Sequence, residues 1–320
     1  MKNVSLINLA IASIYHTSPQ IQADNMKFQL SKSYFSHSFG PLLQSFQNSI
    51  IKLYQTTMKN FLTTPVRIDS EKSFSKTTYS SRIFLKQQNL VTIEQCTFLK
   101  CIDLQRSGGG LYVMTCNATI RKSIFKSCIA KATGAAEITD SDYINFTYNS
   151  IDNCHANRIG ACFFDGKNML SLVFCENSNF TNCNANTWIG GIRLQHNSGK
   201  IKNCIFGGNT ATKYGAVFEF SSSPGFKSFY GCSIINNSAL DNSAGINLFL
   251  MRFHGEIEEC SFINNQNCSV LVESDSCALD ITDSYFTEFK SKEIIVLYKS
   301  CQVEVYDCKF NVDVQKRKKQ

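Results

Sequence analysis

"EECSFINNQNCSV", residues 258–270, contains the pattern that decides the fold: a cysteine, a phenylalanine two residues later and an asparagine three residues after that. Cys260, Phe262 and Asn265 have near copies throughout the chain. The central apolar residue of each copy recurs every 24–29 residues, at Phe98, Phe125, Ile151, Phe180, Phe206, Ile234, Phe262, Phe286 and Phe310. A repeat of this period indicates a solenoid, in which each unit packs on the next.

Further positions repeat at fixed distances from this apolar residue. A strand-forming apolar residue stands five positions before it, and a glycine opens a second short strand nine to twelve positions after most copies. Two columns of small or polar residues are expected. They are Cys96, Cys204, Cys232 and Cys260 two positions before it, and Cys101, Cys128, Cys154, Cys183, Asn209, Asn237 and Asn265 three positions after it.

Three short β segments per repeat, separated by Gly and Asn turns, match one coil of a parallel β-helix. Successive coils stack about 4.8 Å apart, so equivalent side chains lie above one another. Crossovers between parallel strands are almost always right-handed. The sequence therefore predicts an all-β, single-stranded right-handed parallel β-helix, a pectin-lyase-like solenoid, over residues 26–313 with about eleven coils of 23–29 residues.

The N-terminal part of this region fits the same pattern less obviously. Leu30 and Phe35, then Leu53 and Met58, occupy equivalent places, which favours coils. An amphipathic helix over residues 42–61 is the competing interpretation, because apolar residues there also have roughly helical spacing.

Three segments are expected to lie outside the regular coils. Residues 1–25 are interpreted as a signal peptide or an N-terminal cap, because an apolar run follows Lys2. Residues 69–82 are a polar insertion, and residues 314–320 are a basic tail. Nowhere do eighteen apolar residues run together, so no transmembrane span is predicted.

The composition limits the chemistry. The net charge is +7, but lysines and arginines are scattered, so no nucleic-acid partner is predicted. The fifteen cysteines form no Cys-x-x-Cys motif, and we predict no metal and no cofactor. Stacked cysteines lie within disulfide range across coils, although reduced thiols are favoured because in-register side chains point the same way.

Candidate catalytic residues are few. Asp140 with Asp142 and Asp280 with Asp283 form acidic pairs, but neither recurs in neighbouring coils. Cys154 and His155 are adjacent on a strand and so face opposite sides. His196 and His254 stand at non-equivalent places in their coils. No catalytic residue is therefore predicted.

One candidate binding surface remains, on the second strand of each coil. Side-chain alternation predicts that the following residues face outward there: Arg67, Tyr112, Glu137, Phe163, Arg193, Phe218, Asn247, Leu271 and Ile295. Tyr112, Phe163 and Phe218, with Arg193, form the candidate binding stripe for a glycan or protein. Packing of the same aromatic rings beneath loops is the alternative.

The repeat resembles the right-handed β-helix proteins of trichomonad protists and the passenger domains of chlamydial polymorphic outer-membrane proteins. "GGLY", "GAAE", "GGIR" and "GAVF" are similar to the Gly-Gly-Ala-Ile motif of the latter, and "FINN" and "FGGN" to their Phe-x-x-Asn motif. The resemblance covers about residues 26–313. It implies surface display and adhesion.

Three functions are therefore open. The leading interpretation is a non-enzymatic interaction module, secreted or at the cell surface and adhesin-like, with a glycan or protein of a host or neighbouring cell as partner. A polysaccharide lyase or glycoside hydrolase of the same fold is the first alternative. An intracellular (cytoplasmic) or truncated family copy with a scaffold role is the second. The oligomeric state is left open.

Overall fold

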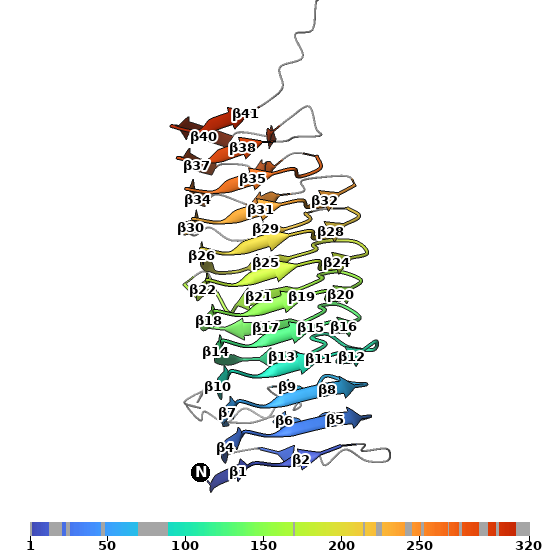
Figure 1. Ribbon diagram of the computed structural model, residues 1–320. Helices are drawn as coiled ribbons and strands as arrows, with labels where there is room; N and C mark the ends of the chain where they lie inside the picture. Colours follow the sequence, from blue (N-terminus) through green and yellow to red (C-terminus); the bar gives the residue numbers. More distant parts are fainter. Residues whose placement is uncertain are drawn as a thin grey trace, which may run out of the picture.

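The chain winds into a straight stack of β-strand rungs (Figure 1). The computed structural model describes residues 2–12, 21–23, 26–45, 49–69, 89–168, 170–213, 215–221, 226–240, 245–250, 253–267, 269–274, 277–287, 294–298 and 301–311. Strands pair in parallel with their equivalents in the next rung. The predicted all-β parallel solenoid is confirmed.

Two sheets of twelve strands run the length of the stack. Sheet A consists of β1 (Lys2–Ile7), β4 (Met26–Ser31), β7 (Ile50–Tyr54), β10 (Asn89–Glu94), β14 (Cys116–Arg121), β18 (Tyr143–Thr147), β22 (Leu172–Glu176), β26 (Ser198–Lys202), β30 (Phe226–Tyr230), β34 (Phe253–Glu258), β37 (Cys277–Thr282) and β40 (Cys301–Tyr306). Sheet B consists of β2 (Ala10–Ile11), β5 (Tyr34–Ser38), β8 (Thr57–Phe61), β11 (Thr97–Leu99), β15 (Ile124–Lys126), β19 (Ser150–Asp152), β23 (Asn179–Thr181), β27 (Ile205–Gly207), β31 (Ser233–Ile235), β35 (Ser261–Ile263), β38 (Tyr285–Thr287) and β41 (Lys309–Asn311).

Two further sheets close the coil, with eleven and six strands. Sheet C consists of β3 (Ile21–Gln22), β6 (Leu43–Ser45), β9 (Val66–Ile68), β13 (Leu111–Met114), β17 (Ala136–Ser141), β21 (Cys162–Gly166), β25 (Ile192–Gln195), β29 (Phe218–Ser221), β33 (Ile246–Leu250), β36 (Val270–Ser274) and β39 (Ile295–Tyr298). Sheet D consists of β12 (Ile102–Asp103), β16 (Ile129–Ala130), β20 (His155–Ala156), β24 (Asn184–Ala185), β28 (Thr210–Ala211) and β32 (Ser238–Ala239).

The register follows the sequence repeat residue by residue. Phe98 pairs with Phe125 and Phe125 with Ile151, and the chain of pairs continues without a slip to Phe310. At the N-terminal end Leu30 pairs with Leu53, as predicted. The described residues between 42 and 61 form β6, β7 and β8, so the helical interpretation is wrong.

The described residues form twelve rungs, one more than predicted, because β1, β2 and β3 pair with β4, β5 and β6. Strand structure thus extends into residues 1–25, and the signal-peptide interpretation of that segment stays a prediction. Apart from Asp69, the predicted insertion at 69–82 lies outside the described residues, as does the basic tail at 314–320.

Each rung turns from sheet A to sheet B at a residue with left-handed backbone. These residues have φ between 48° and 61°: Asn8, Lys32, Gln55, Gln95, Lys122, Tyr148, Asn177, Asn203, Gly231, Glu259, Asp283 and Asp307. Asparagine and glycine tolerate this conformation best, which explains part of the asparagine-rich composition.

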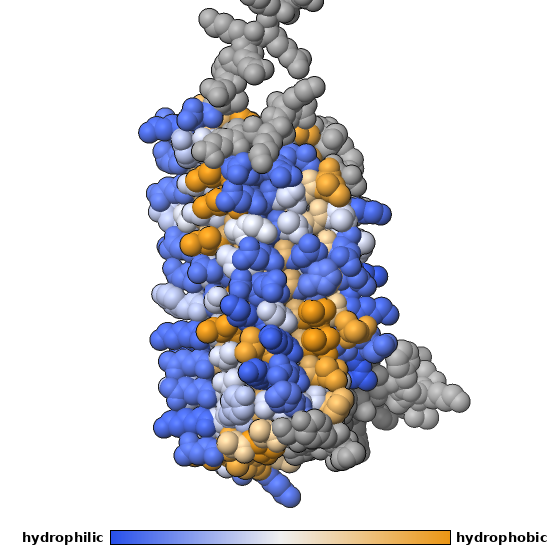
Figure 2. Space-filling view, turned by 45° about the vertical axis from the view of Figure 1, so that its right-hand side comes forward, coloured by the Kyte–Doolittle hydropathy of each residue, from blue (hydrophilic) through white to orange (hydrophobic). Residues whose placement is uncertain are grey.

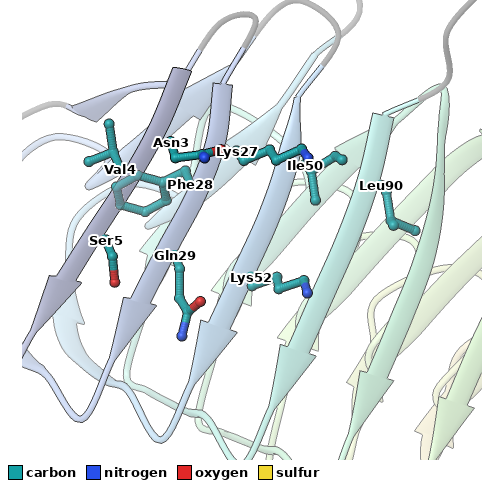
Figure 3. A pocket seen from close by; sticks show the side chains of 9 residues that line it. All are labelled: Asn3, Val4, Ser5, Lys27, Phe28, Gln29, Ile50, Lys52 and Leu90. Atoms are coloured by element: carbon teal, nitrogen blue, oxygen red, sulfur yellow. The ribbon is translucent and has the colours of Figure 1, made fainter. Parts of the chain in front are cut away.

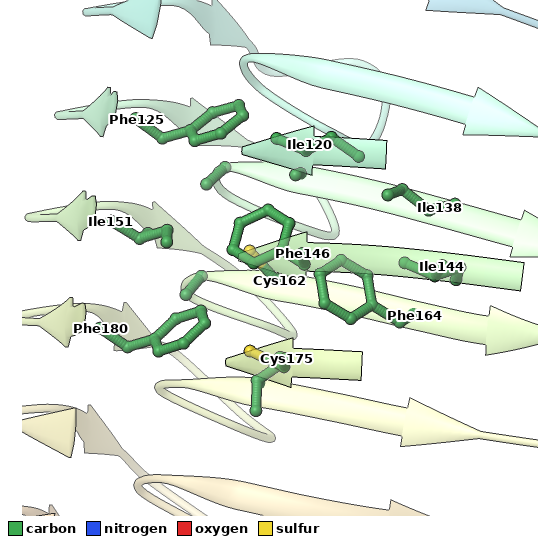
Figure 4. Close-up of a cluster of buried hydrophobic side chains, with 14 of the residues drawn as sticks. Ile120, Phe125, Ile138, Ile144, Phe146, Ile151, Cys162, Phe164, Cys175 and Phe180 are labelled. Atoms are coloured by element: carbon green, nitrogen blue, oxygen red, sulfur yellow. The ribbon is translucent and has the colours of Figure 1, made fainter. Parts of the chain in front are cut away.

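The interior is filled by stacked rings and aliphatic side chains (Figure 4). The ring centroids of Phe98 and Phe125 are 4.7 Å apart, and those of Phe180 and Phe206 are 5.0 Å apart. Both pairs are close to parallel, because in-register rungs place equivalent rings above one another. The repeating phenylalanine therefore provides one continuous core.

A buried asparagine column lies at the turn that follows sheet B. Asn237 Nδ2 donates to the Phe206 carbonyl oxygen at 3.0 Å, and Asn237 Oδ1 accepts from the Asn209 backbone N–H at 2.9 Å. Asn265 repeats the pattern one rung later through the Ile234 carbonyl oxygen and the Asn237 backbone N–H. Each side chain thus satisfies backbone groups of the preceding rung.

Lys227 is an unexpected inward residue of sheet A. It pairs in register with Gly199 and Gly255, and only 3% of its surface is exposed. Burial lowers the pKa of the Lys227 ammonium group from 10.5 to about 7. The glycines above and below leave room for the long side chain.

Replacing Lys227 with methionine is expected to stabilise the protein at pH 6 and to have a smaller effect at pH 10. Between about pH 7 and 10.5 the unfolded chain binds a proton that the folded chain does not. The free energy of unfolding of the natural protein therefore rises with pH across this window. Below about pH 7 the full free-energy cost of burying the charged Lys227 ammonium group is present. Denaturant unfolding of both proteins from pH 6 to 10 measures this; a stability difference that does not change with pH would contradict the expectation.

Candidate functional site

The predicted outward row lies on sheet C. Register pairing joins Arg67 to Tyr112, Tyr112 to Glu137, Glu137 to Phe163, and Phe163 to Arg193. These five side chains therefore form one column on the outer face of successive rungs.

The prediction that Phe218 and Ile295 also face outward is wrong. Phe218 pairs with Ile192, is fully buried, and packs on Phe229 with ring centroids 4.7 Å apart. The prediction aligned Gly215 with Gly190, but in the structure Gly215 pairs with Ile189. The predicted alignment is therefore displaced by one residue, and such a displacement exchanges the inward and outward faces of the strand. The outward residues here are Glu219 and, beside Leu271, Val296.

Tyr112 faces outward but is covered. Only 8% of its surface is exposed, and the Arg67 guanidinium lies 4.1 Å from the ring centroid. Arg67 also forms an ion pair with Asp69 at 2.8 Å. Burial, together with the Glu137 and Asp69 carboxylates, raises the pKa of Tyr112 to about 12. Tyr112 therefore behaves as packed structure, which was the alternative interpretation of the stripe.

Around strands β21 and β25 the outer face of sheet C is more exposed. We call Arg158, Phe163, Trp188, Arg193 and Glu219 the Trp188 patch. The Arg193 guanidinium lies 4.7 Å from the Trp188 ring centroid and 5.7 Å from that of Phe163. The Arg158 guanidinium lies 5.1 Å from the Trp188 ring centroid. Two aromatic rings and two guanidinium groups thus lie together where the loops between sheets D and C reach the outer face of sheet C.

Charges within the Trp188 patch are unequally neutralised. Arg193 forms an ion pair with Glu219 at 2.9 Å, and both side chains are mostly buried. Burial raises the pKa of Glu219, although Arg193 opposes the shift. Arg158 is exposed and Trp188 half-buried. The accessible part of the patch is therefore aromatic and cationic.

Sequence reasoning missed Trp188 and Arg158 because both lie in loops between sheets D and C. Strand alternation makes no statement about loop residues. One signal was present: Trp188 is the only tryptophan of the chain and directly precedes the "IGG" that opens a strand.

The carboxylates of Glu137 and Asp165, on sheet C, already have hydrogen-bond or ion-pair partners. Glu137 Oε2 accepts from Thr133 Oγ1 at 2.6 Å and also from Ser107 Oγ, and burial raises the pKa of Glu137. Asp165 pairs with His196 at 3.0 Å, and burial raises the pKa of Asp165.

The acidic pairs singled out from the sequence do not converge. Asp140 accepts from Thr115 Oγ1 at 2.7 Å, and Asp142 lies 3.8 Å from Lys167 Nζ. Asp280 lies on β37, five strands along sheet A from β18, which follows Asp142. Within the described ranges no group of three or more His, Cys, Asp or Glu side chains could hold a metal ion.

The cysteine columns lie in the core. All cysteines of the two predicted columns are buried, and the side chains described carry no disulfide. Cys175 Sγ and Cys204 Sγ are 3.9 Å apart. Burial raises the pKa of Cys96 to about 11, and that of Cys154 well above its ordinary value. Buried neutral thiols act as small apolar fillers rather than as nucleophiles; their redox state stays a prediction.

Two shallow depressions of the described surface lie on the outer face of sheet A. The larger, of about 440 Å³, lies over β1, β4, β7 and β10, with Lys27 and Lys52 beside Ile50 and Leu90 (Figure 3). The smaller, of about 230 Å³, lies over β22 and β26, where the short side chain of Ser198 stands beside Leu172, Phe174 and Lys200. The face in Figure 2 shows hydrophobic patches interrupted by hydrophilic side chains.

Parallel rungs that pair in register through four sheets define a parallel β-solenoid. The family model described as "Right handed beta helix region" matches residues 73–238, just over half of the chain. The chain belongs to this family. No curated protein and no solved structure matches it significantly. No helix in the described part of the chain is long and apolar enough to cross a bilayer.

Proposed function

We propose that the chain is a non-catalytic β-helix interaction module that binds an acidic glycan of a host or neighbouring cell through the Trp188 patch. The observation that carries the proposal is that Arg193, on β25, lies near the rings of both Trp188 and Phe163, while Arg158 lies near the Trp188 ring. Tryptophan and arginine are the side chains that most often dominate binding energy at interfaces.

The chemistry of the patch supports an anionic saccharide. Arg158 is exposed, whereas Arg193 is neutralised by Glu219, so the accessible charge is positive. A sugar ring presents apolar C–H groups to an aromatic side chain, and its carboxylate or sulfate can accept hydrogen bonds from a guanidinium. The sequence resemblance to trichomonad and chlamydial surface proteins supports a secreted or surface-displayed, adhesin-like role.

Tryptophan fluorescence tests the proposal directly, because Trp188 is the only tryptophan. Titration with polygalacturonate, alginate or heparin is expected to change its emission saturably, whereas neutral dextran is not. Arg158→Ala should weaken binding about tenfold, the loss of roughly 1.4 kcal/mol. Lys200→Ala, at an exposed lysine of the smaller sheet A depression, is the matched control and should bind normally.

Two results would contradict the proposal. One is an unchanged emission with all three acidic polysaccharides, and the other is equal affinity in Arg158→Ala and the natural protein. Release of new reducing ends or unsaturated products during the titration would instead support the lyase or hydrolase interpretation.

A further inference from the structure

The loops that lead from sheet D to sheet C lie one above another along the stack. They follow β12, β16, β20, β24 and β28, which line one side of the molecule in Figure 1. The Lys131 N–H donates to the Arg106 carbonyl oxygen at 2.9 Å, and the Asn157 N–H donates to the Lys131 oxygen at 3.2 Å. Thr187 Oγ1 donates to the Asn157 oxygen, and the Thr187 oxygen accepts from the Lys213 N–H. Equivalent loop residues are therefore held at fixed levels of the stack.

Four of these five loops carry an exposed cation. We call Arg106, Lys131, Arg158 and Lys213 the cationic edge; all four residues are exposed. The remaining loop, between those of Arg158 and Lys213, carries Trp188. Because successive rungs are about 4.8 Å apart, the cationic edge extends about 19 Å along the stack.

The cations of this edge are not neutralised by neighbouring acids. Within the described residues, none of the four forms an ion pair. Two exposed cations on sheets A and B do have such partners: Arg121 pairs with Glu94 at 2.8 Å, and Lys126 with Asp152 at 3.3 Å. The charge of the cationic edge is therefore available to a ligand.

The carboxylates nearest in the chain are turned away from the surface. Asp103 is 3% exposed, and its Oδ1 accepts from the backbone N–H groups of Gln105 and Arg106. Glu137 Oε2 is held by the hydroxyls of the loop residues Thr133 and Ser107. The described strands of sheet D present no carboxylate outward, where the residues are Ile102, Ile129, His155, Asn184, Thr210 and Ser238.

We propose that the cationic edge holds a linear glycan that carries an anionic group on each sugar unit, with the chain lying parallel to the stack axis across the Trp188 patch. This inference rests on the proposed function and names the class of glycan. A glycan with a single terminal carboxylate would need Arg158 alone and would leave the other three cations unused. Cations repeated at successive levels of the stack match anions repeated along an extended chain.

Titration of Trp188 fluorescence with a heparin disaccharide and a heparin octasaccharide tests the length requirement. The octasaccharide is expected to bind at least about tenfold more tightly, because only the longer chain reaches Arg106 or Lys213 while it contacts Arg158. Added salt should weaken octasaccharide binding more than disaccharide binding, since more charge contacts are screened.

A double variant separates the cationic edge from the Trp188 patch. Arg106→Ala with Lys213→Ala removes the two ends of the edge and leaves the patch intact. It should bind the octasaccharide about tenfold more weakly than the natural protein does, and the disaccharide equally well. Lys52→Ala with Lys200→Ala is the matched control, because it removes two exposed lysines from sheet A. The control should bind both ligands normally, and circular dichroism should show that both double variants fold.

Four outcomes would overturn the inference. One is equal affinity of the two double variants for the octasaccharide; if Arg158→Ala still loses binding, the proposed function then stands without the edge. Another is an equal loss of disaccharide binding in Arg106→Ala with Lys213→Ala, since that loss would not depend on a chain that spans the edge. A third is single-stranded oligothymidylate that binds as tightly as the octasaccharide, which would assign the edge to a nucleic acid. The last is a natural protein that does not bind the octasaccharide, in which case polygalacturonate and alginate decide the proposed function separately.

Discussion

Replacing Gly160 with valine is expected to lower the free energy of unfolding by about 4 kcal/mol or more. A Cβ atom at Gly160 would lie 2.4 Å from the Gly190 carbonyl oxygen and 2.8 Å from the backbone N and O atoms of Asn184. All three atoms belong to backbone that is held in the next rung, so none can move without breaking inter-rung hydrogen bonds such as that from the Gly160 N–H to the Ile189 oxygen at 2.8 Å. Denaturant unfolding measures the loss.

Gly207→Val is the matched control. Gly207 lies on β27, where an added Cβ would meet no atom closer than 3.8 Å. Valine is favoured in strands, so this variant is expected to be neutral or slightly stabilising. A Gly160→Val protein as stable as Gly207→Val would show that adjacent rungs are not packed as closely as the structure places them.

Replacing Asn237 with leucine is expected to cost about 3 kcal/mol despite the similar volume of the side chains. The Asn209 backbone N–H and the Phe206 carbonyl oxygen would both lose their buried partner. The Nδ2 to Asn265 Oδ1 hydrogen bond, 3.0 Å long, would be lost too. Water cannot replace these bonds, because Asn209, Asn237 and Asn265 are fully buried.

Asn184→Ala separates the effect of burial from that of losing an asparagine. Asn184 is exposed on β24, and its side chain donates to Thr210 Oγ1 at 2.6 Å. Water can satisfy Thr210 after the change, so we expect a loss below about 0.5 kcal/mol. Equal losses in the two variants, measured by thermal and denaturant unfolding, would refute a special role for the buried column.

Much of the fold could be predicted because residues of the same kind recur at the same position of each repeat. Phe98, Phe125 and Ile151 had to stack once a parallel coil was assumed, since a one-residue slip would turn every apolar side chain outward. The same reasoning recovered the irregular coils around Leu30 and Leu53. It also predicted the outward column from Arg67 to Arg193.

The candidate site was predicted only in part. Phe163 and Arg193 were identified, but the side chains that make a patch of them, Trp188 and Arg158, lie in loops. Phe218 was assigned to the wrong face because the sequence before β29 aligned on a glycine that is displaced by one residue. The length of the preceding loop decides which residues of a strand face inward. The position of a glycine in the sequence does not reveal that assignment.

The sequence by itself determined the class of fold, the parallel register and which residues form the interior columns, because in-register hydrogen bonding stacks equivalent positions of successive rungs, so a pattern that repeats along the chain becomes a column in the structure. Tertiary structure alone decided that Lys227 points inward between two glycines, that Arg67 covers Tyr112, and that two arginines flank Trp188. These are contacts between side chains of different rungs and loops. They depend on the space that neighbours leave, and a repeat in one dimension does not specify that space.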